Sequence, residues 1–201
     1  MNHPKTSIAI VRHGETEWNQ LGLHQGALDS PLTAQGIEQA QNSALKLRQY
    51  SFQAIYSSDL GRAVQTAGII ASVLHLNVIY DSRLRERHLG CLGGLTLNEF
   101  QVRCPDDCKQ FLSGDPDYIL PGGESVRQAF ERSISCFEEL AAKHPDETIL
   151  IVTHGFIIDF IFRYVLKVSL SQKEDFIPEN GRLNWFLKQE NSWMLDTNKN
   201  I

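Results

Sequence analysis

The sequence is poor in cysteine and has no recognisable metal-binding pattern. Its 201 residues include only four cysteines, Cys91, Cys104, Cys108 and Cys136. Cys104 and Cys108 stand four positions apart, and no second pair of that kind accompanies them. Neither a zinc site nor a disulfide framework is therefore indicated. We expect reduced thiols, no metal and no cofactor.

Long hydrophobic runs are also absent. The longest apolar stretch, residues 157–166, is interrupted by Asp159 and Arg163 and falls short of the ~18 apolar residues that indicate a membrane-spanning helix. The first residues, MNHPKTSIAIV, lack the apolar region and small-residue cleavage site of a secretory signal. The sequence therefore predicts a cytoplasmic protein that has no membrane partner.

Positive charge is in short supply. Lys and Arg total 19 against 24 Asp and Glu, which leaves a formal net charge of -5. This balance argues against nucleic acid as a partner, although a local cluster of arginines can still bind a small anion. Hydrophobic residues make up 42% of the chain, and no internal repeat, low-complexity stretch or linker interrupts it. We therefore expect one globular domain over residues 1–201.

Strand and helix patterns alternate along the chain. Short apolar runs predict strands, and apolar residues three and four positions apart predict helices. The predicted strands are residues 7–11, 54–57, 77–80, 148–153, 182–188 and 192–195, and the predicted helices are residues 33–50, 60–74, 125–143 and 156–167. This order predicts an α/β fold, a three-layer α/β/α sandwich with a mostly parallel central sheet.

Residues 90–123 break this alternation. The segment holds six glycines and three prolines among short polar clusters, which predicts loops and short helices. Irregular segments of this length commonly carry function. We expect the segment to form a lid that sets substrate specificity.

Two predicted strands end in a His-Gly pair, the first at His13 and the second at His154. Ligands of parallel sheets bind beyond the carboxyl ends of the strands, so the two histidines are expected to converge. A neutral imidazole can attack phosphorus. Arg12 and Arg62 could hold phosphoryl oxygens, and Glu86 could protonate a leaving alkoxide. These residue types together predict phosphoryl transfer.

The segment RHGETEWN (residues 12–19) resembles the signature of the histidine phosphatase superfamily, also called phosphoglycerate mutase-like. Five further matches follow in order: QGALDSPLTAQGIEQA (25–40), YSSDLGRAVQTA (56–67), LRERHLG (84–90), PGGES (121–125) and VTHG (152–155). The resemblance covers nearly the whole chain. It implies the phosphoglycerate mutase-like fold and catalysis without a metal.

The resemblance also implies roles for single residues. His13 matches the nucleophile that becomes phosphohistidine. Arg12, Arg62 and His154 match the other members of the phosphate pocket, and Glu86 matches the proton donor. The implied substrate is a small phosphorylated molecule.

Four further residues match positions that line the pocket near the substrate. They are Asn19, Gln25, Gly26 and Gly155. His88 lies two residues past Glu86 and could also face the site. The remaining histidines, His3, His24, His75 and His144, are interpreted as ordinary polar residues.

Other functions stay open at this point. His13, His154 and Glu86 could instead bind a catalytic metal, although the chain has no HExxH spacing. The fold could also serve as a non-catalytic module that binds a phosphorylated ligand.

Within the resemblance, a phosphatase and a phosphoglycerate mutase-type transferase are both possible. A mutase needs additional basic residues to bind the second anionic group of its substrate. Residues 90–123 contain only two, Arg103 and Lys109, together with five acidic residues. This composition favours a phosphatase. Phosphatase-like members often have a glutamate where this chain has Gly93. That difference leaves the substrate undetermined.

Overall fold

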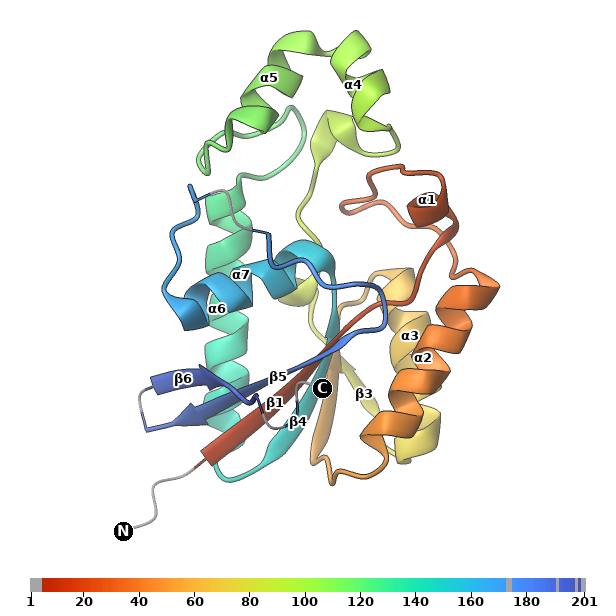
Figure 1. The fold of residues 1–201 in the computed structure, drawn as a ribbon, viewed down its shortest axis with the longest axis vertical. Coiled ribbons are helices and arrows are strands. Elements are labelled where there is room, and N and C mark those ends of the chain that lie inside the picture. Colours follow the sequence, from red (N-terminus) through yellow and green to blue (C-terminus); the bar gives the residue numbers. More distant parts are fainter. Residues whose placement is uncertain (1–4, 173–174, 191, 198, 200–201) are drawn as a thin grey trace.

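A six-stranded sheet forms the centre of the molecule (Figure 1). The computed structural model describes residues 5–172, 175–190, 192–197 and 199, so His3 lies outside the described residues. The strand order is β3-β2-β4-β1-β5-β6. The parallel strands are β1 (Lys5–Arg12), β2 (Ala54–Ser57), β3 (Val78–Tyr80) and β4 (Thr148–Thr153), and the antiparallel strands at one edge are β5 (Leu183–Gln189) and β6 (Ser192–Leu195).

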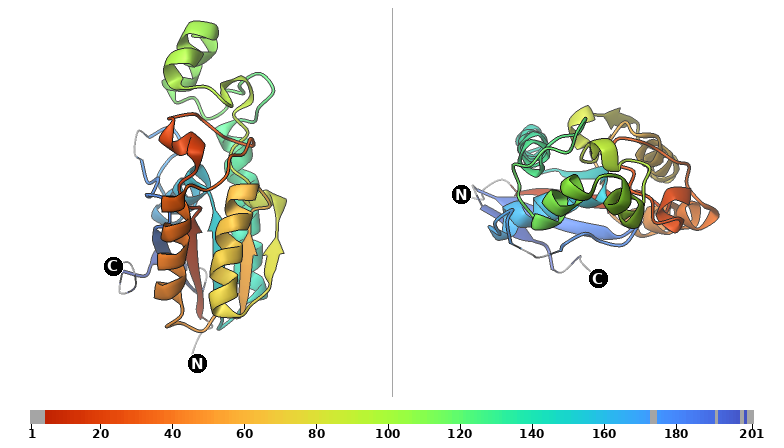
Figure 2. Two further views of the ribbon diagram at one scale, coloured as in Figure 1. Left: turned by 90° about the vertical axis from the view of Figure 1, so that its right-hand side faces the viewer. Right: turned by 90° about the horizontal axis from the view of Figure 1, so that it is seen from above.

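Two pairs of helices cover the two faces of the sheet (Figure 2). One pair is α2 (Ala34–Leu47) with α3 (Gly61–Leu74), and the other is α6 (Val126–Lys143) with α7 (Gly155–Leu166). Successive side chains of a strand point to opposite faces. In β1, Ile8 and Ile10 accordingly pack with α6 and α7, whereas Ala9 and Val11 pack with α2 and α3. Burial on both faces requires the nearly continuous apolar strands seen in the sequence. The predicted three-layer α/β/α fold is confirmed.

Side-chain caps begin two of the predicted helices, α2 and α6. The Thr33 hydroxyl accepts a hydrogen bond from the backbone N–H of Gly36 and begins α2. Ser125 and Gln128 form the predicted capping box that begins α6. The helix predicted over residues 33–50 ends earlier, at Leu47.

The segment over residues 90–123 forms a helical hairpin beyond the carboxyl ends of the parallel strands (Figure 1). Its helices are α4 (Leu97–Arg103) and α5 (Pro105–Ser113), and the short 3₁₀ helices η1 (Ser82–Leu84) and η2 (Gly90–Leu92) precede them. The hairpin has a small core of its own, made by Leu89, Leu92, Phe100, Cys108 and Leu120. Within the described ranges, no helix is both long enough and apolar enough to cross a membrane.

Candidate active site

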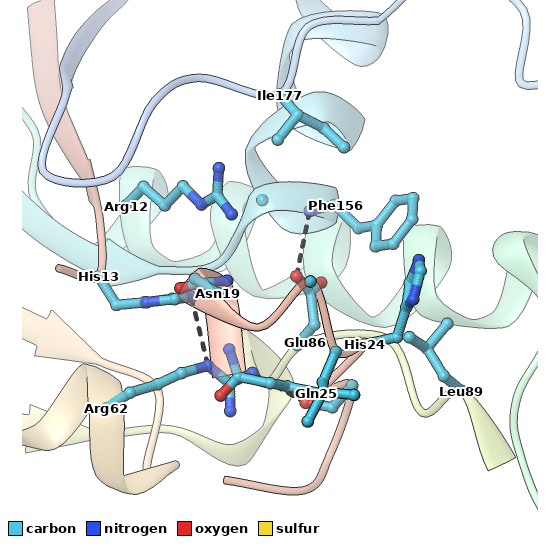
Figure 3. A pocket seen from close by; sticks show the side chains of 14 residues that line it. Arg12, His13, Asn19, His24, Gln25, Arg62, Glu86, Leu89, Phe156 and Ile177 are labelled. Carbon is cyan, nitrogen blue, oxygen red and sulfur yellow. Dashed lines mark hydrogen bonds between the residues drawn. The ribbon is translucent and has the colours of Figure 1, made fainter. Parts of the chain in front are cut away.

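A cavity of about 250 Å³ lies at the carboxyl ends of β1 and β4 (Figure 3). Eight of the nine predicted site residues line it, namely Arg12, His13, Asn19, Gln25, Gly26, Arg62, Glu86 and Gly155. The ninth, His154, is fully buried behind His13, and the centres of the two rings are 5.2 Å apart. The parallel strands have thus brought together residues from the beginning, middle and end of the chain.

The surroundings of His13 determine which ring nitrogen is free to react. Nδ1 lies 2.8 Å from the carbonyl oxygen of Gly14, which can only accept a hydrogen bond. Nε2 lies 3.2 Å from Nε of Arg62, which can only donate one. Both contacts require that Nδ1 carry the proton and that Nε2 carry the lone pair. Burial, reinforced by the charges of Arg62 and Arg12, lowers the pKa of His13 well below 6.5. The ring is therefore neutral at physiological pH.

Arg62 is held in place by oxygens of the loop after β1. Its guanidinium donates to the carbonyl oxygens of Leu28 (2.7 Å) and Gly26 (2.8 Å) and to the Asp29 carboxylate (3.0 Å). Only 1% of Arg62 is exposed. Asp29 also accepts from the Arg62 backbone N–H, at 3.2 Å. These bonds keep the positive charge beside Nε2 of His13, where a phosphoryl group would bind.

His154 and Arg12 each present a buried nitrogen that has no hydrogen-bond partner. Nε2 of His154 lies 2.7 Å from the Ser58 hydroxyl, which also accepts from the Leu60 backbone N–H. If that hydroxyl donates to Nε2, Nδ1 of His154 carries the proton, and Nδ1 is unpartnered. Arg12 donates to the Pro178 carbonyl oxygen at 2.6 Å, while its Nε is unpartnered. Unsatisfied buried donors are rare, and two of them beside His13 suit an anionic ligand.

Glu86 lies across the cavity from the arginines (Figure 3). One carboxylate oxygen accepts from the Arg87 backbone N–H at 3.0 Å, and the other accepts from the Phe156 backbone N–H at 3.3 Å. Burial raises the pKa of Glu86 above 4.5, and the charges of Arg62 and Arg12 oppose that rise. The carboxyl group is thus oriented, and its protonated form persists at a higher pH than in a free glutamate.

Asn19 and Gln25 line the cavity and also fix the loop after β1. Asn19 accepts a hydrogen bond from the Thr16 backbone N–H and so completes a capping box on the short helix α1 (Glu17–Gln20). Gln25 donates to the Thr16 hydroxyl and accepts from the Ser30 hydroxyl. Both side chains therefore have a structural role in addition to any contact with substrate.

Comparison with known proteins identifies the family of the chain. The family model of the histidine phosphatase superfamily (branch 1) matches residues 8–200. The chain belongs to this superfamily. It is 36% identical over 195 residues to a metal-independent phosphoserine phosphatase of Arabidopsis thaliana, a match that covers 96% of this chain and 80% of the relative. It is 38% identical over 187 residues to a probable phosphoglycerate mutase, GpmB, of Proteus mirabilis (strain HI4320), covering 93% of this chain and 87% of the relative.

A solved structure has the same fold. YhfR of Bacillus stearothermophilus superimposes with a TM-score of 0.89 at 28% sequence identity, and the match covers 98% of both chains. The relatives include proteins named as phosphatases and proteins named as probable mutases. Membership in the superfamily therefore leaves the choice between hydrolysis and transfer open.

The structure contradicts the interpretation of one histidine, His24, and shows the position of His88. His88 does not line the cavity: it is exposed, and its Nδ1 accepts from the Gly90 backbone N–H at 3.1 Å. His24, interpreted as an ordinary polar residue, does line the cavity. His75 is exposed, and His144 bonds to the Tyr56 hydroxyl, so both fit the structural interpretation.

Sequence reasoning also missed residues that hold the nucleophile. The Asn180 side chain donates to the His13 carbonyl oxygen at 2.8 Å, and the Thr66 hydroxyl accepts from the Gly14 backbone N–H at 3.0 Å. Asn180 lies in no motif and 167 residues from His13, so no local pattern could have identified it. Thr66 is one helical turn after Arg62, which would have placed it on the same face of α3.

One group of possible metal ligands lies outside the cavity. The ligand atoms of Cys91, Cys104 and Asp107 are all within 4.8 Å of one another in the helical hairpin. Asp107 also accepts a hydrogen bond from the Tyr118 hydroxyl. Because none of these side chains lines the cavity, they offer no ligand set for catalysis at His13.

Gly26 illustrates how the backbone shapes the phosphate site. Its φ is +55°, and a Cβ at this position would lie 2.9 Å from the Arg87 carbonyl oxygen and from the Leu89 backbone nitrogen. We expect Gly26→Ala to lower the free energy of unfolding by about 3 kcal/mol or more, because backbone strain and overpacking add. Urea denaturation measures the change. The matched control is Gly114→Ala, where φ is +78° but nothing lies within 4 Å, and where we expect about 1–2 kcal/mol. Equal effects at the two glycines would contradict the prediction.

Proposed function

We propose that the protein is a metal-independent phosphomonoester hydrolase that acts on a small phosphorylated substrate through a phosphohistidine intermediate. The single observation that carries this proposal is the environment of His13 Nε2. This unprotonated nitrogen of a buried imidazole lies 3.2 Å from an arginine Nε. It faces a cavity that also holds a carboxyl group of raised pKa.

The reaction takes place in two displacements. Nε2 of His13 attacks phosphorus, the bond from phosphorus to the ester oxygen breaks, and Glu86 gives its proton to the departing alkoxide. Water then attacks the phosphohistidine and gives a proton to the Glu86 carboxylate. The bond from phosphorus to Nε2 breaks, and inorganic phosphate leaves. Arg12, Arg62 and His154 stabilise the phosphoryl oxygens by hydrogen bonds and charge throughout.

The charges of the cavity favour hydrolysis over a mutase reaction. A mutase must bind the second anionic group of a phosphoglycerate and must keep water from the phosphoenzyme. Among the described residues that line the cavity, Arg12 and Arg62 are the only Lys or Arg side chains. Both lie beside His13 and bind the transferred phosphoryl group. No further Lys or Arg among these described cavity-lining residues could therefore bind the carboxylate of a phosphoglycerate.

The test of the function is ³¹P NMR of the purified protein with a panel of phosphate monoesters that includes 3-phosphoglycerate, in the presence of EDTA. We expect free inorganic phosphate to appear at a rate that EDTA does not change, because arginine and histidine rather than a metal neutralise the phosphoryl charge. A phosphorus signal that moves between positions without phosphate release would establish the mutase instead. Loss of activity in EDTA that zinc or magnesium restores would exclude the metal-independent mechanism.

The role of Glu86 predicts a dependence on pH and on the leaving group. The hydrolysis needs neutral His13 and protonated Glu86, so kcat/KM falls as pH drops through the lowered pKa of His13 and as pH rises through the raised pKa of Glu86. We expect Glu86→Gln to remove the alkaline limb and to lower kcat for alkyl phosphates by about 10²- to 10⁴-fold. The decrease should be much smaller for 4-nitrophenyl phosphate, whose leaving group needs no proton.

Glu99→Gln is the control for that variant, because Glu99 is an exposed residue that caps α4. It should leave the pH profile unchanged. An equal loss on both classes of ester in Glu86→Gln would argue against proton donation by Glu86.

A further inference from the structure

Four apolar side chains line the cavity, and we call them the apolar collar: Leu23, Leu89, Phe156 and Ile177. Figure 3 shows Phe156, Leu89 and His24 on the side away from His13 and Arg12. A phosphoryl group bound at His13 would direct its ester oxygen toward Glu86 and the alcohol part of the substrate toward this collar.

Packing against the helical hairpin holds the collar in place. Leu89 belongs to the core of the hairpin, and Phe156 packs against that core. The Phe156 ring also stacks on Phe160, with ring centres 6.3 Å apart. Because core side chains are close-packed and hold defined rotamers, Leu89 and Phe156 give the collar a preformed part.

His24 adds one polar atom beside the collar. Its Nδ1 lies 3.2 Å from the Leu95 carbonyl oxygen, so Nδ1 donates a hydrogen bond there, and in the neutral ring Nε2 then has the lone pair. The backbone of His24 is held by the same segment: its N–H donates to the Leu95 carbonyl oxygen, and its carbonyl oxygen accepts from the Gly94 N–H. Nε2 can accept a hydrogen bond from a hydroxyl or an amine of a ligand, but in this tautomer it has no proton for a carboxylate.

The arginines near the collar are already paired. Arg87 is 4% exposed, donates to the Glu124 carbonyl oxygen and lies over the Phe111 ring. Arg85 pairs with Asp59 through two hydrogen bonds, both of 2.6 Å. Neither arginine lines the cavity. A second anionic group in the alcohol part of a substrate would therefore lose water without gaining a cation among the described side chains, which is costly.

We propose that the enzyme selects phosphate monoesters whose alcohol part carries no anionic group and presents an apolar or aromatic face to the collar. This inference rests on the proposed function, because it concerns the leaving alcohol of the hydrolysis. Phe156 and His24 are the specificity-determining residues. The phosphoryl group is the only anionic group of such a substrate, and the alcohol part makes most of its contacts with the collar.

The test compares two substrates that differ only in a remote charge. Benzyl phosphate and 4-carboxybenzyl phosphate have alcohols of similar basicity, so their chemical steps are matched. We expect kcat/KM for benzyl phosphate to exceed that for 4-carboxybenzyl phosphate by about tenfold or more, mainly through KM. Methyl phosphate, which cannot reach the collar, serves as the reference for binding of the phosphoryl group alone.

Two variants test whether the named side chains produce this preference. Phe156→Ala should lower the ratio of kcat/KM for benzyl phosphate to that for methyl phosphate by about tenfold. His24→Arg places a cation beside the collar and should raise kcat/KM for 4-carboxybenzyl phosphate relative to benzyl phosphate. The control is Val102→Ala in α4, because Val102 is 84% exposed and does not line the cavity. It should leave both ratios unchanged.

The outcomes separate this inference from the proposed function. Phosphate release from both benzyl esters at equal efficiency, or faster release from the carboxylate ester, would overturn the preference while leaving the enzyme a phosphatase. A preference that His24→Arg and Phe156→Ala both leave unchanged would show that the collar does not produce it. Absence of phosphate release from all three esters would remove the proposed function and this inference together.

Discussion

Replacement of His13 by alanine is expected to lower kcat by about 10⁴-fold or more and to abolish the phosphoenzyme. Among the described residues that line the cavity, His13 presents the ring nitrogen that accepts a hydrogen bond from an arginine. Glu86 is a poorer nucleophile when protonated, and its two oxygens already accept from backbone N–H groups. Loss of the imidazole therefore removes the covalent path and leaves only binding and charge stabilisation.

Two measurements follow the nucleophile directly. Stopped assays give kcat for the native and variant proteins, and a quench in base after mixing with substrate preserves phosphohistidine for detection by ³¹P NMR. His75→Asn is the matched control, since His75 is exposed with φ +55°, a conformation that asparagine tolerates. A His13→Ala protein with near-native turnover, or one that still carries phosphohistidine during turnover, would refute the mechanism.

Arg62 is expected to have the second-largest effect. Arg62→Lys should lower kcat/KM by about 10²- to 10³-fold, because lysine keeps the charge but lacks the planar fork that reaches several oxygens at once. The lysine variant is preferred to alanine, which would leave the carbonyl oxygens of Gly26 and Leu28 and the Asp29 carboxylate without their shared partner. Unpartnered buried groups would destabilise the fold, so a loss of activity could not be assigned to catalysis alone.

Arg85→Lys is the control for Arg62→Lys. Arg85 is exposed and pairs with Asp59 outside the cavity, so activity should change by less than about twofold. Thermal unfolding of each variant shows whether the fold is retained. Near-native kcat/KM in a folded Arg62→Lys protein would mean that Arg62 does not stabilise the phosphoryl group in the transition state.

Much of the architecture follows from local sequence. Strands buried on both faces must be apolar at consecutive positions, and the runs at β1 and β4 show this directly. Helix α6 begins at a capping box that the sequence predicts from Ser125 and Gln128. The helical hairpin was predicted only as loops and short helices, because Pro105 and Gly114 interrupt its periodicity and its small core joins residues far apart in the chain, Leu89 and Leu120 among them.

The sequence by itself determined the fold class, the superfamily resemblance and the identity of the candidate catalytic residues. The fold class depends on the spacing of apolar residues along the chain. The resemblance and the candidate residues depend on short motifs, each of which can be read locally. The tertiary structure decided the protonated nitrogen of His13, the buried place of His154 behind it, the exposure of His88 and the inclusion of His24 in the cavity. It also brought Asn180 to the His13 carbonyl oxygen. These features depend on through-space contacts between strand ends and loops far apart in the chain, and no local pattern encodes such contacts.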